Sequence, residues 1–232
     1  MQVKTEYAEG RHRKVKKKEK MNGYIAAGVL AAFALWTVLV CFVDVRAIGP
    51  RGTEVGFAVL NGFVHELIGV HMTLYAVTDW MGLVPVGIAM GFAVLGLAQW
   101  IKRKYIRKVD RSILALGGFY AAVMAAYAFF EAVVINYRPV LIGGALEVSY
   151  PSSTTVLVLC VMPTAAMQLN GRIKNGTLRR CAVYLIAAFT GFMLIGRLIS
   201  GVHWVTDIIG GVLLSAGLVL LYCFAAGSEM KK

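Results

Sequence analysis

The chain has 232 residues, of which 59% are hydrophobic and only 16% are charged, well under the roughly 25% charged residues of a typical soluble domain. This composition excludes a soluble globular protein and indicates an integral membrane protein with one helical core. The formal net charge of +12 would suit nucleic acid, but the basic residues flank apolar stretches, so we expect membrane topology, contact with membrane lipids and no nucleic-acid partner.

The N-terminal third of the chain combines a basic tail, one apolar stretch and one mixed segment. Residues 1–20 hold eight lysines and arginines, and we expect a poorly ordered tail there. Residues 21–43 are long enough to span a bilayer and too long for the core of a signal peptide, which predicts a retained anchor helix. In residues 55–75 the apolar side chains are interrupted by polar and charged ones. That pattern predicts an amphipathic helix at the outer membrane interface.

Five further apolar helices are predicted, at residues 83–101, 112–134, 153–169, 181–199 and 203–226. The fold class that follows is all-α. It is a membrane bundle of six transmembrane helices, with the interfacial helix between helices one and two. We treat residues 21–232 as one domain that follows the basic tail of residues 1–20.

The 24 basic residues are distributed very unevenly around these helices. Twenty lie in the tail, in the connections 102–111 and 172–180, and at the C-terminus, all on one side of a six-helix bundle. By the positive-inside rule this side is cytoplasmic. We therefore expect a multi-pass plasma-membrane protein with both termini in the cytoplasm. The extracytoplasmic side keeps only Arg46, Arg51, Arg138 and Arg197.

Polar residues that suit phosphate chemistry converge on that extracytoplasmic side, because helices three and five end there and helices four and six begin there. The candidates are Arg138, Ser152, Ser153, Thr154, Arg197, His203 and Asp207. Arginine forks match phosphate oxygens, and the serine and threonine run opens a helix whose N-terminal amides favour an anion. His203 and Asp207 are four residues apart, so on a helix they would share one face. The carboxylate could then fix the imidazole tautomer and leave the other ring nitrogen free to act.

The spacing Arg197-x5-His203-x3-Asp207 is similar to the third signature of the type-2 phosphatidic acid phosphatase superfamily, the membrane lipid phosphate phosphatases. Arg138-Pro139 resembles the end of its first signature and Pro151-Ser152 the start of its second, and the resemblance covers about residues 112–226.

The resemblance implies functions for these residues. His203 would be the nucleophile that forms a phosphohistidine, and Asp207 would orient it. Arg138, Arg197 and Ser152 would hold the phosphoryl oxygens, with the amide of Ser153 nearby. No cofactor and no metal are expected.

Three positions depart from the signatures of that family. Glu131 stands where the first signature begins with a basic residue, Thr154 stands where the second ends in a histidine, and Gly196 replaces the serine before the third-signature arginine. That histidine is assigned as the acid that protonates the leaving group, and such help is typically worth about 10²–10⁴-fold. A site without it should prefer a leaving group that needs no proton, so we expect a polyprenyl or other lipid diphosphate as substrate. Glu131 could replace the acid if burial raises its pKa, or could pair with Arg138 or Arg197.

Three alternatives stay open beside a lipid phosphate or pyrophosphate hydrolase. The same residues could pass the phosphoryl group to an acceptor other than water. A catalytically impaired relative could bind a lipid phosphate or a protein partner. A transporter would need charged residues through the middle of its spans, whereas here they collect at one side.

Overall fold

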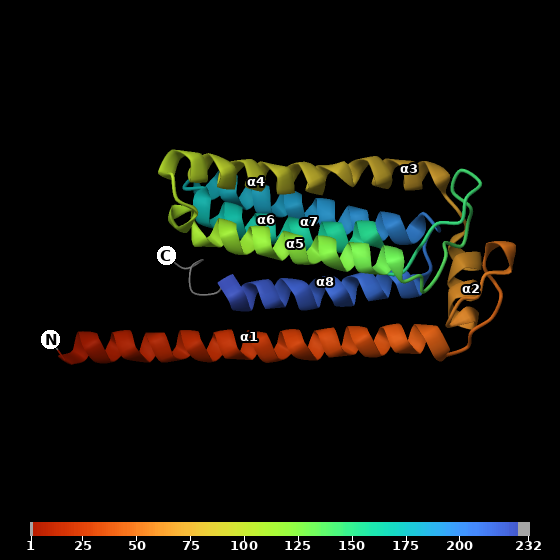
Figure 1. Cartoon of the computed structure of the whole chain (residues 1–232), viewed down its shortest axis with the longest axis horizontal. Coiled ribbons are helices and arrows are strands. Elements are labelled where there is room, and N and C mark those ends of the chain that lie inside the picture. The colour runs from red at the N-terminus through yellow and green to blue at the C-terminus, as the bar shows by residue number, and fades with distance from the viewer. Residues whose placement is uncertain (1, 227–232) are drawn as a thin grey trace.

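The structure is a computed structural model that describes the backbone of residues 2–226 and the side chains of residues 21–226. In that part of the chain the regular elements are helices, and the β pairings are isolated bridges. The helices are α1 (Gln2–Phe42), α2 (Ala58–Ile68), α3 (Met72–Met81), α4 (Leu83–Arg103), α5 (Arg111–Ala132), α6 (Ser153–Arg172), α7 (Gly176–Ile199) and α8 (Val205–Ala226), with 3-10 turns at Pro50–Gly52 and Ile106–Lys108. Figure 1 shows the long helices side by side and the short α2 lying across one end of the bundle.

Six helical segments of the described chain are long and apolar enough to cross a membrane. They are Met21–Phe42, Met72–Arg103, Arg111–Ala132, Ser153–Arg172, Gly176–Ile199 and Val205–Ala226. The predicted all-α class with six spans is therefore confirmed.

Two predicted segments differ from the structure. The second span begins at Met72, because α3 and α4 run on as one 32-residue apolar segment. Between them the amide of Gly82 still donates to the carbonyls of Thr78 and Asp79, both at 3.0 Å. The interfacial helix is thereby reduced to α2. At the other end of the chain α1 begins at Gln2, so the backbone of the expected tail continues the first span. Lysine and arginine are good helix formers, and a helix that already exists needs no new nucleus.

Close helix contacts place α8 and α6 inside the bundle. α8 packs along α1, where a Cβ added to Gly217 would lie 2.6 Å from the Leu30 side chain. Half of the most apolar window of α6 is buried, the largest share among the six spans. Both helices begin at the end of the bundle that carries α2, which we call the α2 end (Figure 1). The N-termini of two well-packed helices are therefore held together at the α2 end.

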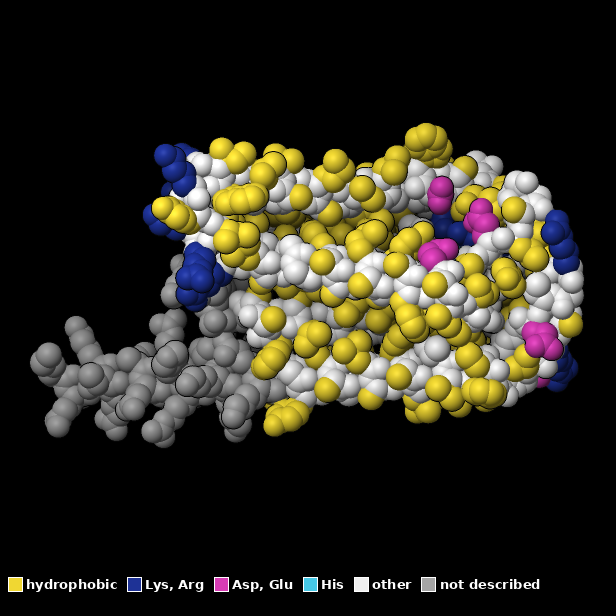
Figure 2. Space-filling view, viewed as in Figure 1, with side chains coloured by type: hydrophobic (Ala, Val, Ile, Leu, Met, Phe, Trp, Pro, Cys, Tyr) yellow, Lys and Arg dark blue, Asp and Glu magenta, His cyan; other side chains and the backbone are white. Residues whose placement is uncertain are grey.

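Charged side chains are distributed differently at the two ends of the bundle, although basic ones occur at both (Figure 2). Lysine and arginine side chains gather at the end opposite α2, where the connections from α4 to α5 and from α6 to α7 lie (Figure 2). Toward the α2 end, acidic side chains surround a recessed basic side chain (Figure 2).

Candidate active site

His203 lies on the tight turn between α7 and α8, two residues before α8 begins at Val205. We expected it on the helix, and that prediction is wrong by these two residues. The turn depends on Gly201, whose φ of +67° suits glycine. A Cβ at this position would lie 1.9 Å from the carbonyl oxygen of Gly69. The connection between α2 and α3 therefore packs directly on the turn that carries His203.

The first turn of α8 is held by two side chains. Asp207 reaches back, and its Oδ2 accepts from the backbone N–H of Trp204 at 2.9 Å, as an acidic residue does in a capping box. Asn61 of α2 accepts from the N–H of Thr206 at 3.3 Å and donates its Nδ2 to the Thr206 hydroxyl at 3.0 Å. These bonds satisfy amides that a helix N-terminus leaves without partners, and they make α2 a support of the site.

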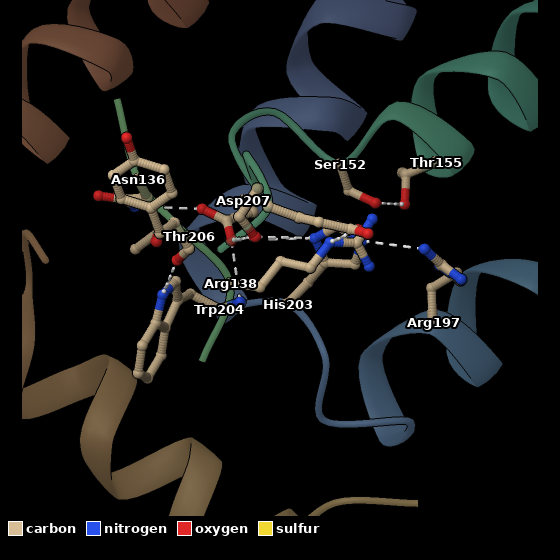
Figure 3. Close-up of polar contacts among 12 residues, drawn as sticks. Asn136, Arg138, Ser152, Thr155, Arg197, His203, Trp204, Thr206 and Asp207 are labelled. Atoms are coloured by element: carbon tan, nitrogen blue, oxygen red, sulfur yellow. Dashed lines mark hydrogen bonds and ion pairs between the residues drawn. The ribbon is translucent and has the colours of Figure 1, made fainter. Parts of the chain in front are cut away.

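A serine connects the candidate nucleophile to the carboxylate. His203 Nδ1 is 4.0 Å from Asp207 Oδ2, too far for a hydrogen bond. Ser149 Oγ lies between them, 2.9 Å from Nδ1, and donates to Oδ2 at 2.5 Å. Because the hydroxyl proton goes to the carboxylate, the hydroxyl oxygen accepts from Nδ1–H. The lone pair of His203 Nε2 then accepts from Arg197 Nη2 at 3.1 Å (Figure 3). Asn136 Nδ2 donates to the other carboxylate oxygen at 3.2 Å.

Burial and neighbouring charge keep His203 neutral. Its side chain is 4% exposed, and this burial lowers the pKa of the imidazole well below its usual value. The positive charges of Arg138 and Arg197 lower that pKa further. A neutral imidazole whose Nε2 carries a lone pair is the form that can attack phosphorus.

Two nearly buried guanidiniums face this histidine. Arg197 is 1% exposed and Arg138 is 8% exposed. Arg138 Nε lies 3.1 Å from Glu147 Oε2, and Arg197 Nη1 lies 3.5 Å from Asp79 Oδ1. These are ion pairs without hydrogen-bond geometry, since Nε and Nη1 of both arginines have no hydrogen-bond partner. Buried donors without partners indicate a place for an anion.

The pairing predicted for Glu131 is not the one in the structure. The partners of the two arginines are Glu147 and Asp79. Glu131 lies near the end of α5 and lines an apolar cavity of about 350 Å³, together with Ser149, Ser153 and Thr154. Thr154, at the position of the missing acid, therefore shares a cavity with Glu131.

The start of α6 contributes a buried serine whose backbone contacts the backbone of Asp207. Ser152 is fully buried, and its backbone N–H donates to the carbonyl of Asp207 at 3.1 Å. Its Oγ accepts from the hydroxyl of Thr155 at 3.0 Å. The structure thus gathers Arg138, Arg197, His203 and Asp207 with Ser152 beside them, and it places Ser153 and Thr154 on the cavity wall.

A sequence model of the PAP2 superfamily matches residues 129–228. This stretch runs from the end of α5 through α8 and contains both arginines, His203 and Asp207. Over this stretch the chain is similar to the PAP2 superfamily. This similarity supports lipid phosphatase activity in general, of the phosphoric ester hydrolase class.

Among solved structures, the chain is similar to a transmembrane PAP2-type phosphatidylglycerolphosphate phosphatase from Bacillus subtilis. The two share 18% sequence identity with a TM-score of 0.54, over 90% of this chain and 98% of the other. At that identity the likeness concerns the fold. No curated protein matched the sequence.

Sequence reasoning missed the residues that orient His203. Asn136 and Ser149 lie at the two ends of the loop between α5 and α6, and the amide of Ser149 donates to the carbonyl of Asn136 at 2.9 Å. An isolated bridge between Tyr137 and Val148 closes the same loop. The only signal in the sequence was that each polar residue lies two or three positions from a predicted phosphate ligand.

Proposed function

We propose that this protein hydrolyses a lipid phosphate through a phosphohistidine on His203, at the extracytoplasmic face of the plasma membrane. The observation that supports it most is the Asp207–Ser149–His203 chain of hydrogen bonds, which leaves Nε2 unprotonated beside the buried guanidinium that donates to it. A site built only to bind an anion has no need of a carboxylate and a hydroxyl behind the imidazole.

In the first step the lone pair of His203 Nε2 attacks phosphorus. The bond from phosphorus to the leaving oxygen breaks, and its electron pair departs with that oxygen. The imidazole gains positive charge, which the carboxylate of Asp207 stabilises through the Ser149 hydroxyl. Arg138 and Arg197 donate to the phosphoryl oxygens, and Arg197 gives up its contact with Nε2 as it turns to the anion. Water then attacks phosphorus, the P–N bond breaks, and inorganic phosphate leaves.

The apolar cavity beside Ser149 suits the lipid part of such a substrate. Its lining includes Val86, Val123, Phe130, Val156 and Leu214. Ser149 and Tyr150 also border it, so a chain in the cavity could stay apolar along its length while its phosphate reaches the arginines.

The leaving group is the point on which substrate class depends. An alkoxide leaving from a monophosphate strongly needs a proton, whereas a phosphate leaving from a diphosphate is a far weaker base. The position of the family's acid is Thr154, which has no acidic proton to give. We therefore propose a polyprenyl or other lipid diphosphate as the substrate.

Turnover by the purified protein in detergent or liposomes tests this proposal. We expect release of inorganic phosphate from a lipid diphosphate to exceed release from the matching monophosphate, and we expect His203→Ala to abolish both. A clear preference for the monophosphate would contradict the leaving-group argument. Acid-labile, base-stable radiolabel on the wild-type protein would identify the phosphohistidine.

Two other functions would give distinct results in the same assay. A phosphotransferase would consume the lipid and label its histidine, but would release inorganic phosphate only when no acceptor is present. A catalytically impaired relative would bind the lipid phosphate without turnover, and His203→Ala would then change nothing in the phosphate assay.

A further inference from the structure

The helix α3 lies outside residues 129–228, the stretch matched by the superfamily, yet three of its side chains reach the candidate site. Tyr75, Thr78 and Asp79 are spaced i, i+3 and i+4, so they share one face of the helix. Thr78 is fully buried, and Asp79 pairs with Arg197. We call these three residues the α3 face.

Tyr75 contacts both phosphate-binding arginines. The Cζ atom of Arg138 lies 5.7 Å from the centre of the Tyr75 ring, and the Cζ atom of Arg197 lies 5.1 Å from it. Two positive groups held close together repel each other, and the face of an aromatic ring attracts a cation within about 6 Å. The Tyr75 ring therefore offsets part of this repulsion and restricts the positions of both guanidinium groups.

Asp79 forms an ion pair with one of the same arginines, and this contact competes with anion binding instead of supporting it. Its Oδ1 is 3.5 Å from Arg197 Nη1, while its side chain stays 55% exposed. A carboxylate in this place is a counter-ion for Arg197. An incoming phosphate must displace it to reach Arg197.

Gly196 explains why α3 can lie so close to the site. A Cβ at this position would lie 2.7 Å from Thr78 Cγ2. The Thr78 hydroxyl is held by the carbonyls of Leu74 and Tyr75, at 2.9 and 3.0 Å, so this side chain cannot simply turn away. Just before α3, the amide of His71 donates to the carbonyl of Ser200, at the end of α7, at 2.9 Å. The glycine that replaces the family's serine makes the room that α3 occupies.

We propose that the α3 face sets the anion affinity of the site: Tyr75 is a positioning residue for Arg138 and Arg197, and Asp79 competes with phosphate for Arg197. This inference rests on the proposed function for its substrate, but its test uses orthovanadate, a phosphate mimic whose binding needs no turnover. Affinity is read from thermal protection of the purified full chain and, where turnover is found, from inhibition.

The two residues should change affinity in opposite directions. Tyr75→Leu should weaken orthovanadate binding about tenfold, as expected for lost cation–π contacts at a desolvated site, while Tyr75→Phe keeps the ring and should bind as wild type does. Asp79→Asn should tighten binding about two- to fivefold, the range of an exposed ion pair. Glu54→Gln is the matched control, since Glu54 is an exposed carboxylate of the loop before α2 and forms no ion pair within the described residues.

The directions of the two affinity changes distinguish a specific role of the α3 face from general damage to α3. Weaker binding in both Tyr75→Leu and Asp79→Asn would mean that α3 is merely structural and would overturn the proposal, as would wild-type affinity in Tyr75→Leu. Equal tightening in Asp79→Asn and Glu54→Gln would assign the effect to net charge and overturn the role of Asp79. Wild-type protein that orthovanadate does not protect would also overturn it. If orthovanadate binds with the predicted signs but no lipid phosphate is hydrolysed, the proposed function fails and the role of the α3 face stands.

Discussion

Removal of the Ser149 hydroxyl is the sharpest test of the hydrogen-bond chain behind His203. In Ser149→Ala the imidazole Nδ1–H loses its acceptor, and the 4.0 Å gap to Asp207 Oδ2 is too wide for a direct bond. The lost bond matters most when the imidazole becomes positive. A hydrogen bond to a charged group contributes about 1.5–3 kcal/mol, so kcat/KM should fall roughly 10- to 100-fold.

The assay is phosphate release from a lipid diphosphate by purified protein, with thermal unfolding measured in parallel. Ser149→Thr keeps a hydroxyl and should recover part of the lost rate. Ser215→Ala is the matched control, because Ser215 is also buried but its hydroxyl donates to the carbonyl of Gly211 within α8, at 2.6 Å. The reasoning is refuted if Ser149→Ala turns over at the wild-type rate, or if the control loses as much as Ser149→Ala does.

Three further predictions follow from neighbouring contacts. Arg138→Gln removes a positive charge that lowers the His203 pKa, so that pKa rises and the acid limb of kcat/KM moves to higher pH. The prediction fails if the acid limb of Arg138→Gln lies at the wild-type pH. It also fails if the rate at which diethyl pyrocarbonate modifies His203 has the same pH dependence in both proteins. Gly196→Ser restores the family's residue, yet it should lower the free energy of unfolding by about 1–3 kcal/mol, because its Cβ meets Thr78; a stabilised variant in thermal unfolding would argue against the tight approach of α3. Gly201→Ala should lose about 2–4 kcal/mol of stability and most turnover, from its positive φ and the nearby carbonyl, and a normal melting temperature would show that the turn relaxes easily.

α2 and the connection after it support the turn and the helix start that carry the candidate site. Asn61 holds the first turn of α8, and Gly69 packs on Gly201. From the sequence this segment was expected to lie at the membrane surface, because its polar residues interrupt an apolar stretch. Within that segment Asn61 is buried, and its side-chain oxygen accepts from the backbone N–H of Thr206 in α8. The sequence pattern does not show what a polar residue of an amphipathic segment will bind, because the hydrogen-bond partner of Asn61 is 145 positions away.

The sequence by itself determined the class of protein and the six spans, and it predicted the end of the bundle where the candidate residues meet. Apolar length decides which segments can cross a bilayer, and the alternation of helix direction then brings the ends of α5 and α7 to the starts of α6 and α8. The motif spacing was enough to group Arg197, His203 and Asp207, because residues a few positions apart cannot be far apart in space. Arg138 was added by the helix topology, which places the loop after α5 at the same end of the bundle.

Only the tertiary structure decided how those groups contact one another. The two-residue shift of His203 off α8 opened the gap that Ser149 fills, and the continuation of α4 into α3 brought Tyr75 and Asp79 to the arginines. Such contacts depend on distances of about an ångström between segments far apart in the chain. Periodicity and spacing constrain a residue's neighbours along its own helix, whereas the packing of one helix on another sets which side chains meet.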